Sequence, residues 1–236
     1  MDLRASPAAG GTAAAEVAAT PRAEAAPAAQ ATADATALRL DTALALLRQA
    51  GQAEPSAEPG SPAYLQALLD QLVDLSSRDA LTGLANRRHF GDQLAREANR
   101  AGDTGRPLSL CVLDIDHFKA INDRSGHLAG DSALRAVAEE VRRVAGPLEL
   151  PCRLGGDEFA LVLRVSDDGE LANRALGLMA AIRSLRLPSL REHRLSVSVG
   201  GAFCVDPGGW SSWYSQADAA LYEAKRKGGD HWRLSA

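Results

Sequence analysis

The sequence predicts an α+β domain of the ferredoxin-like βαββαβ type, preceded by a helical stalk and a disordered tail. Near-continuous apolar runs are typical of buried strands, one other segment alternates as a half-buried strand does, and the segments between them have helical periodicity. We expect a sheet covered on one face by helices. The expected strands include 108–115, 159–165 and 194–204, and the expected helices lie at 87–101, 129–144, 170–187 and 216–227.

Composition bounds the classes of function. The chain has 236 residues, of which 46% are hydrophobic and 24% charged, and its net charge is −4. Broad binding to nucleic acid or anionic lipid needs a clustered excess of Lys and Arg, so we expect no nucleic-acid partner. No apolar stretch approaches the roughly 20 residues that span a bilayer, and the N-terminus lacks a leucine-rich signal segment. The three cysteines lie far apart without a CxxC spacing. These features favour a cytoplasmic location and no membrane span.

The N-terminal part divides into three segments. Residues 1–37 are rich in Ala and Pro and have too few large apolar side chains to fold, so we expect a disordered tail. Residues 38–60 are expected to form a short helix and a linker, with Leu40, Leu44 and Leu47 at helical spacing. Residues 61–78 are expected to form a helical stalk, which leaves 79–236 as the catalytic domain.

The stalk carries a leucine stripe. Leu65, Leu68, Leu72 and Leu75 alternate in steps of three and four, as a and d positions of a coiled coil do, and Leu69 widens the stripe. Fewer than three heptads are present, so two interpretations stay open at this point. The helix packs on its own domain, or it forms a parallel dimer stalk.

Acidic residues follow the first buried strand. In Asp114-Ile115-Asp116, strand alternation places the two carboxylates on one face and exposes the Ile115 carbonyl, which gives oxygen ligands of the kind Mg²⁺ prefers. The alternative is an Asp that caps the next helix.

A second acidic cluster, Gly155-Gly156-Asp157-Glu158, lies between two apolar strands. The glycines supply positive φ at a hairpin, and the two successive acids repel each other unless a cation compensates them. A solvated acidic tip is the alternative. If the two strands are adjacent and antiparallel, Asp114 and Asp157 meet around a metal.

A third cluster suits the recognition of guanine. Guanine offers an N1–H and a 2-amino group on one edge, and a carboxylate can accept both. Asp131 together with Asn122 is therefore a plausible guanine reader, although Asp131 also suits the first turn of a helix.

Together these segments resemble the GGDEF-domain family of diguanylate cyclases, from about Asp79 to the end of the chain. The motifs stand in the family's order: DALTGLANR at 79–87, DIDHFKAIND at 114–123, GHLAGD at 126–131, RLGGDEF at 153–159, SVG at 198–200 and ADAALYEAK at 217–225. The resemblance implies the palm fold of nucleotidyl cyclases and the condensation of two GTP into cyclic di-GMP, a signalling nucleotide, with release of two pyrophosphates.

The resemblance also implies roles for residues. Asp114, the Ile115 carbonyl and Asp157 would hold Mg²⁺ or Mn²⁺, and Glu158 or Asp157 would deprotonate the ribose 3′-hydroxyl. The substrate-binding residues would be Asn122, His127, Asp131, Lys119 and Lys225. Because each domain of this family holds one GTP, the resemblance implies a homodimer and favours the stalk as its seam.

Two positions depart from the family. The RxxD motif of product inhibition falls on Gly146 and Glu149, so we expect no product-inhibition site. Gly229 stands where an Arg commonly contacts the phosphates, so we expect weaker GTP binding that Gly229→Arg would strengthen.

Other functions remain open at this stage. A non-catalytic nucleotide-binding effector is one, although such proteins usually lose the signature acids that this chain keeps. A nucleotidyl cyclase or polymerase palm of another specificity is a second, but it would not require Asn122 and Asp131 together. The N-terminal helix or the stalk is a possible docking segment for an activating protein.

Overall fold

The computed structural model describes residues 40–104, 107–190, 194–204 and 209–235. The tail expected at 1–37 lies outside these residues. The chain separates into two units, 1–46 and 47–236, which are described one by one. The described part of the first unit begins the helix α2 (Asp41–Gln49), near the helix expected from Leu40, Leu44 and Leu47.

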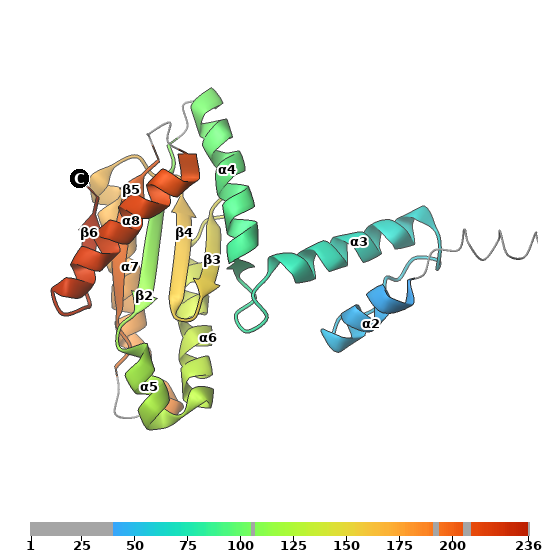
Figure 1. The fold of residues 1–236 in the computed structure, drawn as a ribbon, viewed down its shortest axis with the longest axis horizontal. Coiled ribbons are helices and arrows are strands. Elements are labelled where there is room, and N and C mark those ends of the chain that lie inside the picture. Colours follow the sequence, from blue (N-terminus) through green and yellow to red (C-terminus); the bar gives the residue numbers. More distant parts are fainter. Residues whose placement is uncertain (1–39, 105–106, 191–193, 205–208, 236) are drawn as a thin grey trace, which may run out of the picture. The chain divides into compact units, whose positions relative to one another are not determined.

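The second unit contains a six-stranded mixed sheet (Figure 1). The strand order is β1-β3-β4-β2-β5-β6, in which β2 pairs antiparallel with both β4 and β5. The four inner strands thus have the ferredoxin-like order, and the predicted fold class is confirmed. The strands are β1 (Ala85–Asn86), β2 (Ser109–Ile115), β3 (Leu150–Gly155), β4 (Glu158–Leu163), β5 (Val197–Phe203) and β6 (Trp232–Leu234).

Helices cover both faces of this sheet, so the expectation of a single covered face is wrong. Successive residues of β2 point to opposite faces. Leu113 joins a cluster with α6 and α7, whereas Val112 joins a cluster with α4 and α8. All seven residues of β2 are buried as a result. The helices of the unit are α3 (Pro62–Ser77), α4 (Arg87–Thr104), α5 (Phe118–Ser125), α6 (His127–Val144), α7 (Asp168–Ser184), the 3₁₀ turn η1 (Pro188–Leu190) and α8 (Gly209–Arg226).

The predicted stalk helix is α3. The Ser61 hydroxyl caps it by accepting a hydrogen bond from the Tyr64 N–H at 3.1 Å. Leu68 of the leucine stripe is 2% exposed, whereas Leu69 is 57% and Val73 62% exposed. The apolar surface that remains open on α3 is therefore centred on Leu69 and Val73, one position away from the expected seam.

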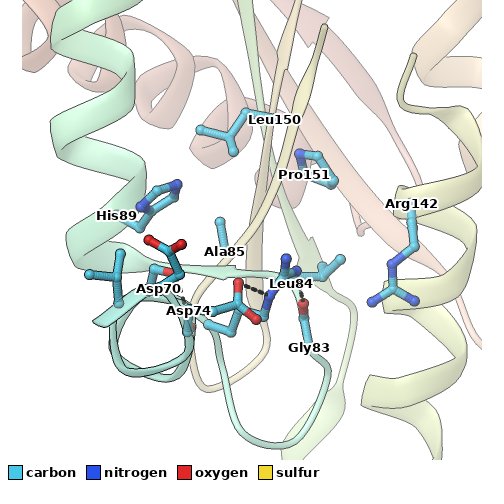
Figure 2. Close-up of a pocket in the computed structure, with 12 residues that line it drawn as sticks. Asp70, Asp74, Gly83, Leu84, Ala85, His89, Arg142, Leu150 and Pro151 are labelled. Carbon is cyan, nitrogen blue, oxygen red and sulfur yellow. Dashed lines mark hydrogen bonds and ion pairs between the residues drawn. The ribbon is translucent and has the colours of Figure 1, made fainter. Parts of the chain in front are cut away.

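The end of α3 is bonded to the segment that contains β1. The Asn86 amide of β1 donates to the Ser76 carbonyl at 2.7 Å, and Arg78 bridges the Asp74 carboxylate (2.7 Å) and the Gly83 carbonyl (3.0 Å). Figure 2 shows the hollow beside this junction. Carbonyls that the helix end leaves without intrahelical partners are thus used to fix the junction.

None of the helices that the structure describes is both long and apolar enough to cross a membrane.

Candidate active site

The hairpin between β3 and β4 forms a braced acidic tip. Gly155 (φ 144°) and Gly156 (φ 51°) adopt conformations that other residues rarely take. The Arg153 guanidinium donates to the Gly156 carbonyl at 2.7 Å and to the Asp79 carboxylate at 2.9 Å. Burial alone would raise the pKa of Asp79, but hydrogen bonds from Thr82 and Arg153 hold it below its usual value. Asp79 and Arg153 both lie in the motifs at 79–87 and 153–159, but the motifs alone predict no role for either side chain.

The sheet brings the two acidic clusters together. Asp114 at the end of β2 lies opposite Glu158 at the start of β4, and the Ile115 N–H donates to the Asp157 carbonyl at 3.2 Å. The expected antiparallel contact between these segments is therefore confirmed. Asp114 therefore lies beside the consecutive acids Asp157 and Glu158, which are distant from it in sequence, at one end of two inner strands.

Asp114 is a carboxylate in an unfavourable environment for its charge. It is 6% exposed. Burial raises its pKa to about 6, the neighbouring Asp157 and Glu158 also raise it, and the Lys225 ammonium at 2.6 Å partly offsets this rise. The arrangement favours a cation at this position.

A cavity of about 370 Å³ opens beside these acids. It brings together Asp114, Ile115, Asp157, Lys119 and Lys225, which are the predicted metal and triphosphate residues. Two cations beside two carboxylates suit a ligand that combines phosphates with a divalent metal.

The oxygen atoms that line this cavity fit Mg²⁺ only together with a bound triphosphate. Among the described residues, no three His, Cys, Asp or Glu side chains form a closed metal cluster. Mg²⁺ is usually held by one or two carboxylates together with substrate phosphates and water. Asp114, Asp157 and the Ile115 carbonyl therefore fit an open site that a bound triphosphate completes.

The predicted guanine residues lie on another pair of elements. Asn122 is on α5, and Asp131 and His127 are on α6, with Gly126 (φ 82°) between the two helices. A Cβ on Gly130 would lie 2.0 Å from Asn122 Oδ1, so Gly130 allows α6 to approach the Asn122 amide. These residues do not line the cavity beside Asp114, and His127 is exposed.

A close approach of α8 to the sheet positions Lys225. A Cβ on Gly200 of β5 would lie 2.1 Å from the Ala217 carbonyl oxygen and 2.2 Å from the Leu221 nitrogen. Only a glycine there lets α8 lie against the sheet, which places Lys225 in the last turn of α8 beside Asp114.

The sequence model of the family described as "Diguanylate cyclase, GGDEF domain" matches residues 76–231. The chain belongs to the GGDEF family. Among curated relatives, it is 34% identical over 168 residues to the probable diguanylate cyclase DgcC of Escherichia coli. That match covers 70% of this chain and 45% of DgcC, so the chain spans less than half of this relative's length.

Solved GGDEF structures agree with the fold. The coiled coil and GGDEF domain of DgcB from Caulobacter crescentus, in complex with c-di-GMP, has a TM-score of 0.68 and 36% identity, over 72% of this chain and 92% of that one. Diguanylate cyclase SiaD in complex with its activator SiaC, from Pseudomonas aeruginosa, has a TM-score of 0.65 and 29% identity, over 88% of this chain and 78% of that one.

Glu149, at the Asp position of the GGDEF family's RxxD motif, is engaged within the chain. Its carboxylate accepts hydrogen bonds from the Gly146 N–H at 2.7 Å and from the Arg174 guanidinium at 2.5 Å, and its side chain is 8% exposed. The Arg164 N–H also donates to it, at 3.3 Å. This acid is a structural ion-pair partner in the GGDEF domain described here.

Proposed function

We propose that this protein is a diguanylate cyclase that acts as a homodimer, with one GTP in each GGDEF domain. The observation that carries the proposal is the cavity in which Asp114 and Asp157 lie beside Lys119 and Lys225. In a GGDEF domain, this set provides metal ligands and phosphate neutralisation at one place. Asn122 and Asp131 give the guanine preference.

The reaction is an in-line substitution at phosphorus. The 3′-oxygen of each GTP forms a bond with the α-phosphorus of the other, and the bond from each α-phosphorus to pyrophosphate breaks, so two substitutions close the ring and release two pyrophosphates. A bound Mg²⁺ or Mn²⁺ lowers the pKa of the 3′-hydroxyl and neutralises charge on the leaving group. Glu158, or Asp157 beside it, accepts the hydroxyl proton. Lys225 neutralises Asp114 in the free protein and the triphosphate in the complex.

The dimer is required because each domain supplies half of the reactants. Two GTP-loaded domains must face each other, and a parallel helix pair through α3 would hold them in that orientation. Leu69 and Val73 are the apolar side chains that α3 leaves most exposed, which supports a seam centred on them. Light scattering on Leu69→Lys tests this seam, with Ala63→Lys, at an exposed position off this face of α3, as the control.

Product inhibition through RxxD is not expected. Position 146 has no side chain, and the Glu149 carboxylate is already bonded by Arg174 and two backbone N–H groups. Calorimetry should detect no tight cyclic di-GMP binding. Tight binding that Glu149→Ala abolishes would contradict this part of the proposal.

An activating protein is a candidate partner for the N-terminal helix or the stalk. The neighbour SiaD was solved with an activator, and its match covers most of this chain. Deletion of residues 1–60 should then leave the basal fold intact and remove activation. Unchanged regulation in cells would exclude the N-terminal helix as the partner site.

An assay of GTP turnover tests the proposal that the protein is a diguanylate cyclase. Purified protein with GTP and Mg²⁺ should form cyclic di-GMP and pyrophosphate, and Asp157→Ala should not. A protein that binds GTP without forming product would instead be the non-catalytic effector. Formation of a cyclic mononucleotide would indicate a cyclase of another specificity.

A further inference from the structure

Asp116 lies two residues after Asp114 and lines the same cavity, but three hydrogen bonds from the protein hold its carboxylate. The Ser198 hydroxyl donates to Oδ1 at 2.7 Å, and the Ser196 hydroxyl donates to Oδ2 at 2.7 Å. The Asp230 N–H also donates to Oδ2, at 2.8 Å. A carboxylate has about four acceptor positions, so three are already used. This leaves little capacity for a metal, in contrast to Asp114.

The Asp230 N–H belongs to the turn that follows α8. Gly228, Gly229 and Asp230 have φ values of 104°, 80° and 54°, and such values are uncommon for a residue other than glycine. The Arg183 guanidinium also forms an ion pair with the Asp230 carboxylate, at 2.9 Å. An unusual turn of this kind persists only where surrounding contacts fix it.

The turn is continuous with the phosphate side of the cavity. The Gly228 N–H donates to the Lys225 carbonyl at 3.0 Å, and Gly228 and Gly229 line the cavity together with Lys225. The turn therefore restrains the C-terminal end of α8, including the Lys225 backbone that the packing of α8 places beside Asp114.

Gly229 allows the carboxylate to lie this close. A Cβ at this position would be 2.8 Å from Asp116 Oδ1 and 2.9 Å from its Cγ, and these atoms are held by two serines. The absence of a side chain at 229 and the bonds of Asp116 thus belong to one arrangement, the Asp116 clasp, which consists of Asp116, Ser196, Ser198 and the Asp230 N–H.

We propose that Asp116 is a positioning residue that fixes the turn at 228–230 and, through it, Lys225 against the triphosphate. The triphosphate as the ligand rests on the proposed function, whereas the clasp itself does not. The rival role is the one that strand alternation suggested, a metal ligand equivalent to Asp114.

Asparagine at position 116 separates the two roles. In the clasp, the oxygen of an asparagine side chain can still accept from Ser196 and the Asp230 N–H, and its amide can donate to the Ser198 hydroxyl, which is able to accept. If Asp116 is a metal ligand, asparagine should weaken metal binding, because an amide lacks the negative charge that holds a divalent cation. Alanine removes both functions.

The experiment compares Asp116→Ala, Asp116→Asn and Asp114→Asn with the wild type. Hydrogen exchange of the Asp230 amide in nucleotide-free protein reports the clasp. It should be faster by about tenfold in Asp116→Ala, the effect of losing one hydrogen bond, and close to the wild-type rate in Asp116→Asn and Asp114→Asn. Calorimetry with GTP and Ca²⁺ should show weaker binding in Asp116→Ala than in Asp116→Asn.

Two results would overturn the proposal. One is unchanged Asp230 exchange in Asp116→Ala. The other is loss of Mn²⁺ binding in Asp116→Asn to the same extent as in Asp114→Asn, which would make Asp116 a metal ligand. The exchange measurement needs neither nucleotide nor turnover, so a protein that makes no cyclic di-GMP would refute the proposed function and leave the clasp intact.

Discussion

Asp114 and Glu149 are both acids with little solvent exposure, but their surroundings differ. Glu149 has a guanidinium at 2.5 Å and two backbone N–H donors. Asp114 has one lysine at 2.6 Å and two acidic neighbours, and burial raises its pKa to about 6. The first acid is satisfied by the fold. The second is compensated only in part, and such a group is expected where a cation or substrate supplies the missing charge.

The comparison predicts the largest effect for Asp114→Asn. Cyclic di-GMP formation should fall by more than about a hundredfold, as expected when a group that stabilises developing charge is removed. The metal-free protein should at the same time become more stable at pH 8, by roughly 2 kcal/mol, because ionising a carboxyl whose folded pKa is raised costs stability. Denaturant unfolding in EDTA at pH 8 and at pH 4 measures this difference, which should vanish at pH 4. Equal stability at pH 8 would show that Lys225 fully compensates Asp114.

Glu149→Ala should lower the stability of the protein and leave its activity nearly unchanged. Loss of the carboxylate removes the ion pair of Arg174, which keeps its hydrogen bond to the Val144 carbonyl, and leaves the Gly146 N–H without its acceptor. The free energy of unfolding should therefore fall by about 2 kcal/mol. Arg174 is partly exposed, which keeps the loss below that of a fully buried pair. The KM for GTP should stay near its wild-type value. Glu139→Ala, on an exposed pair with Arg142, is the matched control and should cost little.

The pH dependence of metal binding sharpens the comparison further. The pKa of Asp114 is raised to about 6, so below that pH the carboxyl is protonated before a metal can bind. The affinity of the nucleotide-bound protein for Mg²⁺ should therefore fall by about tenfold per pH unit below pH 6 and level off above it. Calorimetric titration between pH 5 and pH 8 checks this. A flat profile would place the critical ionisation elsewhere.

The smallest effect is expected for Gly229→Arg. The sequence suggested that this change would strengthen GTP binding, but the structure adds a cost, because residue 229 has φ 80° and a Cβ there would lie 2.8 Å from Asp116 Oδ1. The added guanidinium and the strained turn oppose each other, so KM should change by less than about threefold. Steady-state kinetics with GTP measures this KM, with Lys227→Arg as the control. A large fall in KM would show that the turn accommodates the arginine without strain.

Several elements were predictable because their signals are local. The apolar run of β2 and the periodicity of α6 identify a buried strand and an amphipathic helix without any tertiary information. The start of α8 at Gly209, ahead of the expected 216, was missed although Trp210, Trp213 and Ala217 have helical spacing, because the serines between them are weak helix formers. The coverage of both sheet faces was missed because periodicity shows that a helix has an apolar side but not which face of the sheet it contacts.

The sequence by itself determined the family, the fold class and the set of candidate acids and lysines, because all of these follow from which residue types occur and in which order. The tertiary structure decided what each acid does. Asp114 and Asp116 have the same spacing signal, yet the first lies between two acids and a lysine and the second between two serines and a backbone N–H. Charge compensation depends on neighbours that are about 80 to 110 residues away, such as Ser196, Ser198 and Lys225, and only folding brings those neighbours together.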